Sequence, residues 1–158
     1  MSLDEDLKRI RAVADYQLGK GVGAELFLAK VKILFSKRTG RIRYVYLDGK
    51  RLATMRPTDG LFSLSIRGAK RIFENASHAA CFVTVQNDVS KFIAEGGDVF
   101  AAHVVKADGE IRAKDEVIVI GSTCNVLAVG RAVLSGEEMT AFKRGVAVKV
   151  RRGCVDEG

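Results

Sequence analysis

The first half of the chain begins with a helix-type pattern of apolar residues and continues with strand-type patterns. Residues 3–18 place apolar side chains at the 3.6-residue spacing of one helix face, with three acids in the first turn. The glycine-rich stretch "GKGVGAELF" ends this pattern. Alternating apolar and polar residues then predict strands joined by turns at Asp48-Gly49 and at "PTDG". The predicted strands cover 30–36, 41–47, 51–55 and 61–66, and a second helix covers 67–76. These elements predict a small α+β layer.

The second half carries shorter apolar runs separated by glycine and aspartate. Asp88 is predicted to cap a short helix over 89–95, which Gly96 and Gly97 end. Gly130 lies inside an apolar run, which indicates a bulge or a barrel corner. The predicted strands cover 81–86, 98–107, 116–121, 126–134 and 145–152. Closely spaced short strands with one or two helical turns predict a small, partly closed barrel.

The change of pattern falls near "ASHAAC", residues 76–81. We therefore predict two domains, an α+β domain over 1–78 and a mainly-β pseudo-barrel over 79–158. The 158 residues are 47% apolar, a composition typical of a folded chain with a real core.

Positive charge is distributed unevenly along the chain, which carries a formal net charge of +7. The first 80 residues hold 16 Lys and Arg against 8 Asp and Glu, whereas the remaining residues hold 10 against 11. Half of the cations of the second part nevertheless gather between 143 and 152, where there is no acid. This asymmetry favours a polyanionic partner, although a solvated basic face gives the same composition.

The last predicted strand carries the first candidate site. Alternation places Val146, Val148 and Val150 on one face and Ala147, Lys149 and Arg151 on the other. Further cations precede and follow this strand at Lys143, Arg144 and Arg152. Such a line of cations can neutralise the phosphates of a nucleic acid. The alternative is a solvated edge strand, where Lys and Arg oppose aggregation, and the pattern does not choose between the two.

Two further segments are candidate contacts for an anion. The helix end and loop "FIAEGGDVFAAHV", 92–104, offers main-chain N–H groups beside two glycines, although the same pattern is typical of an ordinary helix cap. The predicted hairpin tip "SKRTGRIR" crowds four cations together, and simple exposure explains them equally well. These cations are Lys37, Arg38, Arg41 and Arg43.

No catalytic or metal-binding pattern is predicted. The cysteines are three in number and far apart, and the two histidines, His78 and His103, have no ligand-spaced companions. Asp59 is the most enzyme-like carboxylate, but an Asp before Gly is what a tight turn uses. We predict no cofactor and no catalytic residue. The acidic N-terminal segment, the scattered cysteines and the lack of a long apolar run predict a cytosolic protein without a membrane helix.

The second half closely resembles a PUA domain, the RNA-binding module named for pseudouridine synthases and archaeosine transglycosylases. The resemblance is carried by "FIAEGGDVFAAHVVKADGEIRAKDEVIVI" and "LAVGRAVLSGEEMTAFKRGVAVKVRRG", with Gly96, Asp115, Gly130 and Gly145 at the family spacing. The first half, "GKGVGAELF" with "SKRTGRIRYVYLDGKRLATMRPTDGLFSLSIRGAKRI", resembles the domain that precedes PUA in archaeal tRNA-guanine transglycosylase. Nearly the whole chain is covered.

This resemblance implies RNA binding, most simply of tRNA during base modification. It implies that RNA lies against the short helix, the loop that contains Gly96 and Gly97, the following strand and the basic last strand. We call the loop with these two glycines the glycine loop. Carried onto this chain, the implied contacts are Lys91, Gly96, Gly97, Asp98, Val99, Phe100, Lys143, Arg144, Lys149, Arg151 and Arg152.

The chain departs from the family in one respect. It is too short for the transglycosylase (β/α)₈ barrel and lacks its zinc ligands. We therefore expect a non-catalytic RNA-binding chain, either free-standing or serving a separately encoded catalytic chain. The alternatives are a ribosome-assembly factor with a PUA domain and an enzyme whose active site the sequence does not reveal.

Overall fold

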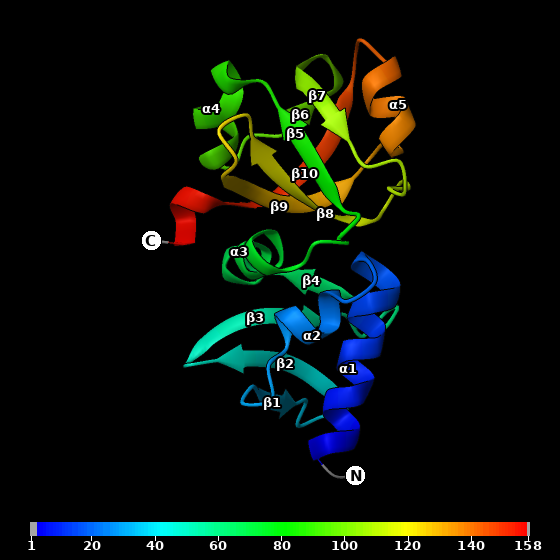
Figure 1. Ribbon diagram of the computed structural model, residues 1–158, viewed down its shortest axis with the longest axis vertical. Helices are drawn as coiled ribbons and strands as arrows, with labels where there is room; N and C mark the ends of the chain where they lie inside the picture. Colours follow the sequence, from blue (N-terminus) through cyan, green and yellow to red (C-terminus); the bar gives the residue numbers. More distant parts are fainter. Residues whose placement is uncertain (1–2, 158) are drawn as a thin grey trace. The chain divides into compact units, whose positions relative to one another are not determined.

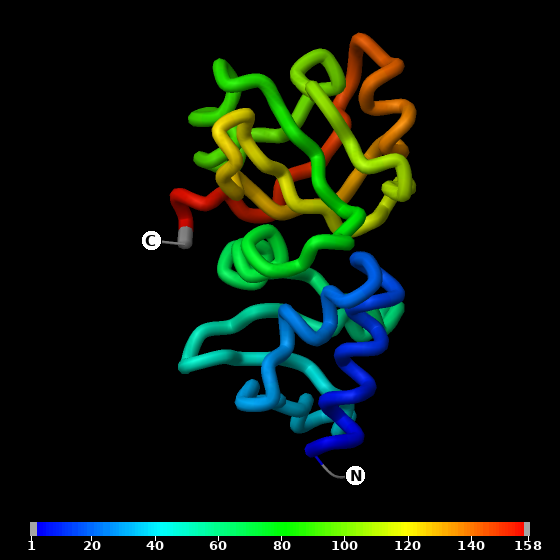
Figure 2. Tube along the Cα trace, in the orientation of Figure 1, coloured from blue at the N-terminus to red at the C-terminus, as the bar shows by residue number. Residues whose placement is uncertain are grey.

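The computed structural model describes residues 3–157, and the chain divides into two compact units, Met1–Ala79 and Ala80–Gly158. We call them the N-terminal and C-terminal units. Figure 2 shows that the backbone passes from the first unit to the second without returning. None of the helices within 3–157 combines the length and the apolar character needed to cross a membrane.

Over its described residues, 3–79, the N-terminal unit is a four-stranded antiparallel sheet with three helices, arranged as in Figure 1. The helices are α1 (Leu3–Leu18), α2 (Val22–Leu26) and α3 (Ile66–Asn75). The strands are β1 (Lys32–Phe35), β2 (Ile42–Leu47), β3 (Lys50–Met55) and β4 (Phe62–Leu64), in the spatial order β1-β2-β3-β4. The predicted helix over 3–18 is confirmed, and its apolar face is buried.

Backbone conformation fixes the turn between β2 and β3, and side-chain hydrogen bonds join α1 to β4. Asp48 and Gly49 have φ of 51° and 79°, as the two-residue hairpin between β2 and β3 requires. Gln17 of α1 holds β4, because its side chain accepts a hydrogen bond from Phe62 N at 2.7 Å and donates one to Phe62 O at 2.8 Å. The Phe62 ring packs on Phe27 with 5.1 Å between centroids.

Two predictions for the N-terminal unit are wrong in detail. The strand predicted to reach residue 66 ends at Leu64, because Ser65 caps α3 by accepting a hydrogen bond from Gly68 N at 3.0 Å. The glycine-rich stretch after α1 contains the unpredicted helix α2, where Gly23 N donates to Asp15 Oδ1 at 2.7 Å.

The C-terminal unit is a six-stranded sheet in the order β6-β10-β9-β8-β5-β7. Its strands are β5 (Phe82–Val85), β6 (Val99–Phe100), β7 (Val104–Ala107), β8 (Glu116–Gly121), β9 (Val126–Ala132) and β10 (Val146–Gly153). Its α-helices are α4 (Ser90–Ala94) and α5 (Gly136–Ala141), and its 3-10 turns are Asn87–Val89, Ala101–His103 and Cys154–Glu157. Strands β5 and β8 run parallel, whereas the other described pairs are antiparallel.

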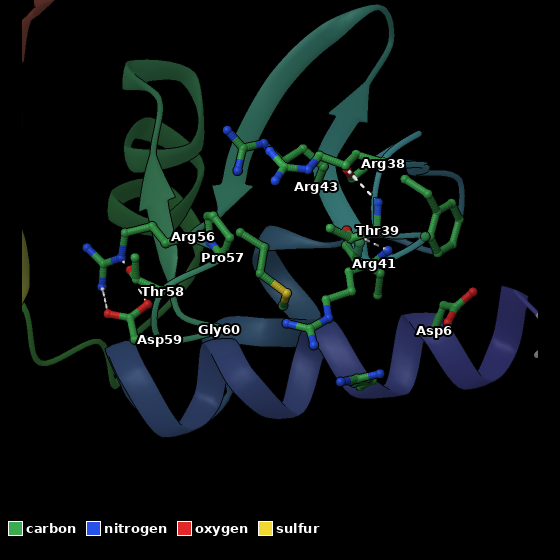
Figure 3. A pocket seen from close by; sticks show the side chains of 16 residues that line it. Asp6, Arg38, Thr39, Arg41, Arg43, Arg56, Pro57, Thr58, Asp59 and Gly60 are labelled. Atoms are coloured by element: carbon green, nitrogen blue, oxygen red, sulfur yellow. Dashed lines mark hydrogen bonds and ion pairs between the residues drawn. The ribbon is translucent and has the colours of Figure 1, made fainter.

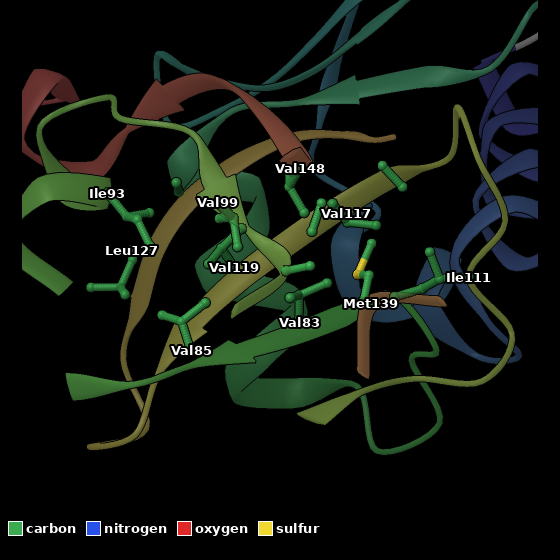
Figure 4. Packing of buried hydrophobic residues seen from close by; sticks show 14 of the residues in the cluster. Val83, Val85, Ile93, Val99, Ile111, Val117, Val119, Leu127, Met139 and Val148 are labelled. Atoms are coloured by element: carbon green, nitrogen blue, oxygen red, sulfur yellow. The ribbon is translucent and has the colours of Figure 1, made fainter. Parts of the chain in front are cut away.

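Apolar side chains from the strands and both short helices meet in one core (Figure 4). Val83, Val119 and Val148 come from three different strands and are fully buried, while Ile93 of α4 and Met139 of α5 close the core from the helices. The predicted fold class, an α+β domain followed by a mainly-β pseudo-barrel, is confirmed.

Three local predictions for the C-terminal unit are wrong in detail. The strand predicted over 98–107 is interrupted, because the 3-10 turn at Ala101–His103 separates β6 from β7. Asp88 does not cap the short helix: it lies within the 3-10 turn that leads into α4, and α4 has no side-chain cap. The bulge predicted at Gly130 lies instead in the paired strand β10, whose register shifts between Val150 and Arg152, and an added Cβ on Gly130 would lie 2.3 Å from Lys149 O.

Candidate nucleic-acid interface

The glycine loop and the basic last strand lie side by side in the C-terminal unit. Strand β6 pairs with β10, Phe100 opposite Val146, and Ala101 N donates to Gly145 O at 2.9 Å where β10 begins. At the other end of β10, a Cβ on Gly153 would lie only 2.2 Å from Ala94 O, at the end of α4. The structure therefore joins two segments about 50 residues apart into one surface. We call residues 91–100 with 143–152 the β10 surface.

Most cations of the β10 surface are exposed. Lys143 and Arg144 occupy the loop between α5 and β10, and Arg152 lies near the far end of the strand. Lys149 Nζ lies 3.8 Å from Asp98 Oδ2, but its side chain is 76% exposed. Such a loose, solvated pair leaves Lys149 accessible to a ligand.

Arg151 differs from these cations because it pairs with a buried carboxylate. Its Nη1 lies 2.9 Å from Glu116 Oε1 and its Nη2 lies 2.5 Å from Glu116 Oε2, and the Glu116 side chain is 0% exposed. A bidentate guanidinium–carboxylate pair of this kind is among the stronger polar contacts in proteins. Arg151 therefore supports the strand, and no sequence signal identified Glu116 as its partner.

The predicted alternation of the last strand holds only in part. Val148 faces the core as predicted, but Ala147, which alternation placed among the cations, is fully buried. The register of β10 against β9 shifts between Val150 and Arg152, so the simple two-residue period ends there. This bulge separates the surroundings of Arg151 from those of Arg152.

The glycine loop is bordered by two exposed phenyl rings. A Cβ on Gly97 would lie 2.2 Å from the Phe92 ring, so this glycine lets the ring lie over the backbone. Phe92 is 55% and Phe100 40% exposed, and Phe100 packs edge-on against His103. Phe92 begins the candidate segment 92–104 but was not among the implied contacts, because an apolar residue in a short helix is ordinarily assigned to the core.

The remaining predicted contacts of the glycine loop and α4 differ from one another in burial and in hydrogen bonding. Asp98 Oδ1 accepts a hydrogen bond from Val150 N at 2.9 Å, which ties the loop to β10. Val99 is fully buried in the core, whereas Lys91 on α4 is exposed. Gly96 has φ of 106°, a backbone conformation that favours glycine at a helix end.

The predicted basic hairpin tip borders a cavity of about 1130 Å³ within the N-terminal unit (Figure 3). Arg38, Arg41 and Arg43 line it, while Lys37 is not among the lining residues. Sequence reasoning missed Arg9 of α1 and Arg56 after β3, which lie far from the hairpin in the sequence. We call this cavity the arginine groove. Its lining comprises Asp6, Arg9, Phe35, Ser36, Arg38, Thr39, Gly40, Arg41, Ile42, Arg43, Met55, Arg56, Pro57, Thr58, Asp59 and Gly60.

Asp59 and Cys81 both have surroundings that the local fold explains. Asp59 Oδ1 accepts a hydrogen bond from Leu61 N at 3.0 Å, and its Oδ2 lies 3.1 Å from Arg56 Nη2, as expected for a turn aspartate. Burial, and then the charge of Asp108, raise the pKa of the Cys81 thiol well above its usual range, so it stays protonated at neutral pH.

Both units match known domain families. Residues 8–78 match the patch-forming domain C2 of tRNA-guanine transglycosylase, and residues 82–154 match the PUA domain. The chain is a C2 domain followed by a PUA domain. It is 44% identical over 150 residues to the tRNA-guanine(15) transglycosylase of Methanobrevibacter smithii, a match that covers 94% of the chain and 23% of the relative. The chain thus spans about a quarter of that enzyme and corresponds to its C-terminal region.

Solved structures share the C2–PUA fold. A protein of Pyrococcus horikoshii superposes with a TM-score of 0.75 at 25% identity, covering 97% of this chain and 92% of its own. A conserved PUA domain protein of Thermoplasma acidophilum superposes with a TM-score of 0.68 at 21% identity, covering 97% and 91%. The second likeness shows the arrangement of elements alone.

Proposed function

We propose that this chain binds structured RNA, with tRNA as the main substrate class, and serves tRNA base modification. The β10 surface of the PUA domain is the proposed contact. The relatives named for tRNA-guanine(15) transglycosylase support the link to tRNA modification. The observation that carries the proposal is the packing of Gly153 on the end of α4, because it brings the glycine loop beside the exposed cations of β10.

In this proposal the β10 surface contacts mainly the sugar-phosphate backbone of the RNA. Lys143, Arg144 and Arg152 neutralise phosphates, since their side chains are exposed at the two ends of the strand. Gly96, where an added Cβ would meet nothing within 4 Å, admits the sugar-phosphate chain close to the protein backbone. The exposed rings of Phe92 and Phe100 offer faces on which unpaired bases stack.

The other implied contacts either hold the RNA-binding segments in place or add positive charge. Asp98 and Val99 fix the loop, Arg151 fixes the strand through Glu116, and Lys149 and Lys91 add positive charge. Recognition of this kind is dominated by shape and backbone, as expected for a folded RNA.

The test is a salt titration of tRNA binding with a triple variant, Lys143→Gln with Arg144→Gln and Arg152→Gln. We expect the salt slope to fall by about 0.7–0.9 per lost phosphate contact and the affinity by on the order of fivefold per contact at about 0.1 M salt. The control carries the same charge change on exposed cations of the same unit, Lys106→Gln with Arg112→Gln and Lys114→Gln. Equal behaviour of the two triple variants would refute the β10 surface as the RNA contact.

A competition series separates tRNA from ribosomal RNA as the substrate. Unmodified tRNA, tRNA lacking its 3′ single strand and a ribosomal RNA fragment of matched length compete for a labelled tRNA. We expect intact tRNA to compete best. Preference for the ribosomal fragment would instead support a role in ribosome assembly.

We also propose that base exchange, where this chain serves it, is carried out by a separate catalytic chain. The residues match domain C2 and PUA, which account for about a quarter of the transglycosylase of Methanobrevibacter smithii. Nucleoside analysis of tRNA incubated with this chain alone should show no new base. A modified nucleoside formed by the purified chain would contradict this division of labour.

A further inference from the structure

We propose that the arginine groove of the C2 domain is a second RNA site, which holds consecutive phosphates of the sugar-phosphate backbone. This inference rests on the proposed RNA binding and extends it from the PUA domain to the N-terminal unit. It gives the C2 domain a direct contact with the substrate.

The groove gathers arginines from three separate segments of the unit. Arg9 comes from α1. Arg38 and Arg41 come from the turn between β1 and β2, Arg43 from β2 itself, and Arg56 follows β3 (Figure 3). The hairpin tip is closed by backbone hydrogen bonds, Ser36 N to Arg41 O and Gly40 N to Ser36 O, both 2.8 Å. These bonds fix the backbone that carries Arg38 and Arg41. Less conformational entropy of the turn is therefore lost when an anion binds.

Positive charge dominates the lining, with five arginines against two aspartates. Asp59 is paired with Arg56. Asp6 is 5% exposed, and its Oδ1 is shielded from solvent and has no hydrogen-bond partner within residues 3–157. In the same part of the chain, neither Arg38 nor Arg41 forms an ion pair with a carboxylate, and both side chains are exposed. These guanidinium groups are thus available to an anion from outside this unit.

The type of cation and the size of the groove favour phosphates of a polymer. Guanidinium groups match phosphate oxygens in a bidentate manner that lysines cannot reproduce. A cavity of about 1130 Å³ with arginines at several points exceeds what one free phosphate fills. Phe35 and Met55 also line it, and Phe35 is 46% exposed, so an apolar surface is available for a ribose or a stacked base.

The test compares Arg38→Gln with Arg41→Gln, as a double variant of the full chain, with Arg51→Gln and Arg67→Gln. The control arginines are exposed on the same unit and do not line the groove, so both variants lose two positive charges. For the groove variant we expect tRNA affinity to fall by on the order of fivefold per lost contact and the salt slope to fall by about 1.4–1.8. Thermal unfolding should match that of the control, because both substitutions are on exposed side chains.

The outcomes separate this inference from the proposed function. If the groove variant binds tRNA like its control while the β10 triple variant loses affinity, the groove inference fails and the proposed function stands. If neither variant changes binding, both fail. A small phosphorylated ligand is the other source of the same chemistry, so pyrophosphate is titrated by calorimetry. Tight pyrophosphate binding that the groove substitutions abolish, without any effect on tRNA, would overturn the RNA assignment.

Discussion

The two basic regions of this chain obtain their charge in different ways. The β10 surface draws its cations from one strand, the loop before it and α4, whereas the arginine groove collects cations from a helix, a strand and two turns. In the PUA domain, carboxylates that are distant in the sequence pair with cations of the strand. Glu116 forms an ion pair with Arg151, and Asp98 lies near Lys149. In the groove, Arg56 has its acid partner three residues away, and Arg38 and Arg41 form no carboxylate pair within the described chain.

The density of charge along a sequence thus does not equal the charge that is available to a ligand. Residues 143–152 contain five cations and no acid, which made this segment the most conspicuous basic stretch. Folding nevertheless places a buried carboxylate under one of its arginines. A ligand therefore meets a smaller charge on β10 than the sequence suggests, and a larger one in the groove.

The largest expected effect concerns the packing that forms the β10 surface. Gly153→Ala places a Cβ about 2.2 Å from Ala94 O, so the strand and the end of α4 must separate. Overpacking of this kind costs about 1–3 kcal/mol of unfolding free energy. Chemical denaturation measures the loss, and tRNA binding of the remaining folded protein should fall as well.

Gly109→Ala is the matched control for that substitution. It is a glycine of the same unit at which an added Cβ would meet nothing within 4 Å, and its backbone has no left-handed requirement. We expect it to unfold like the parent chain. Equal stability of the Gly153 and Gly109 variants would show that the approach of α4 to β10 is not fixed by the glycine.

An effect on stability of similar size should distinguish two neighbouring arginines. Arg151→Ala removes the guanidinium from buried Glu116, so we expect a loss of about 1–3 kcal/mol in unfolding free energy. Arg152→Ala should instead leave stability almost unchanged and weaken tRNA binding by on the order of fivefold. Denaturation and salt titration on both variants check this split, and the reverse pattern would assign the RNA contact to Arg151.

The arrangement of elements followed from the sequence because local signals agreed with one another. The apolar spacing of α1 and the Asp48-Gly49 turn each specified one local structure, and the structure contains both. The departures arose where a single side chain changed the outcome, as when Ser65 capped α3 and shortened the preceding strand. Such capping competes directly with strand extension and depends on tertiary packing.

The site was less predictable because its partners are distant in sequence. Alternation identified the cations of β10, but it could not reveal the bulge at Arg151 or the carboxylate 35 residues earlier. The hairpin arginines were also identified, whereas Arg9 and Arg56 join them only through the fold. A pattern within one segment contains no information on pairs of this kind.

The smallest expected effect tests the charge of the groove without removing any arginine. Asp59→Asn keeps an oxygen that accepts the Leu61 N–H and removes the negative charge beside Arg56. One unit charge acting over about 8 Å in water changes affinity roughly two- to threefold, so we expect tighter tRNA binding by that factor. Asp48→Asn is the control, since it makes the same charge change at an exposed hairpin turn outside the groove lining. Salt titration of both variants decides: a gain confined to the Asp59 variant places RNA in the groove, whereas equal gains reflect only the net charge of the chain.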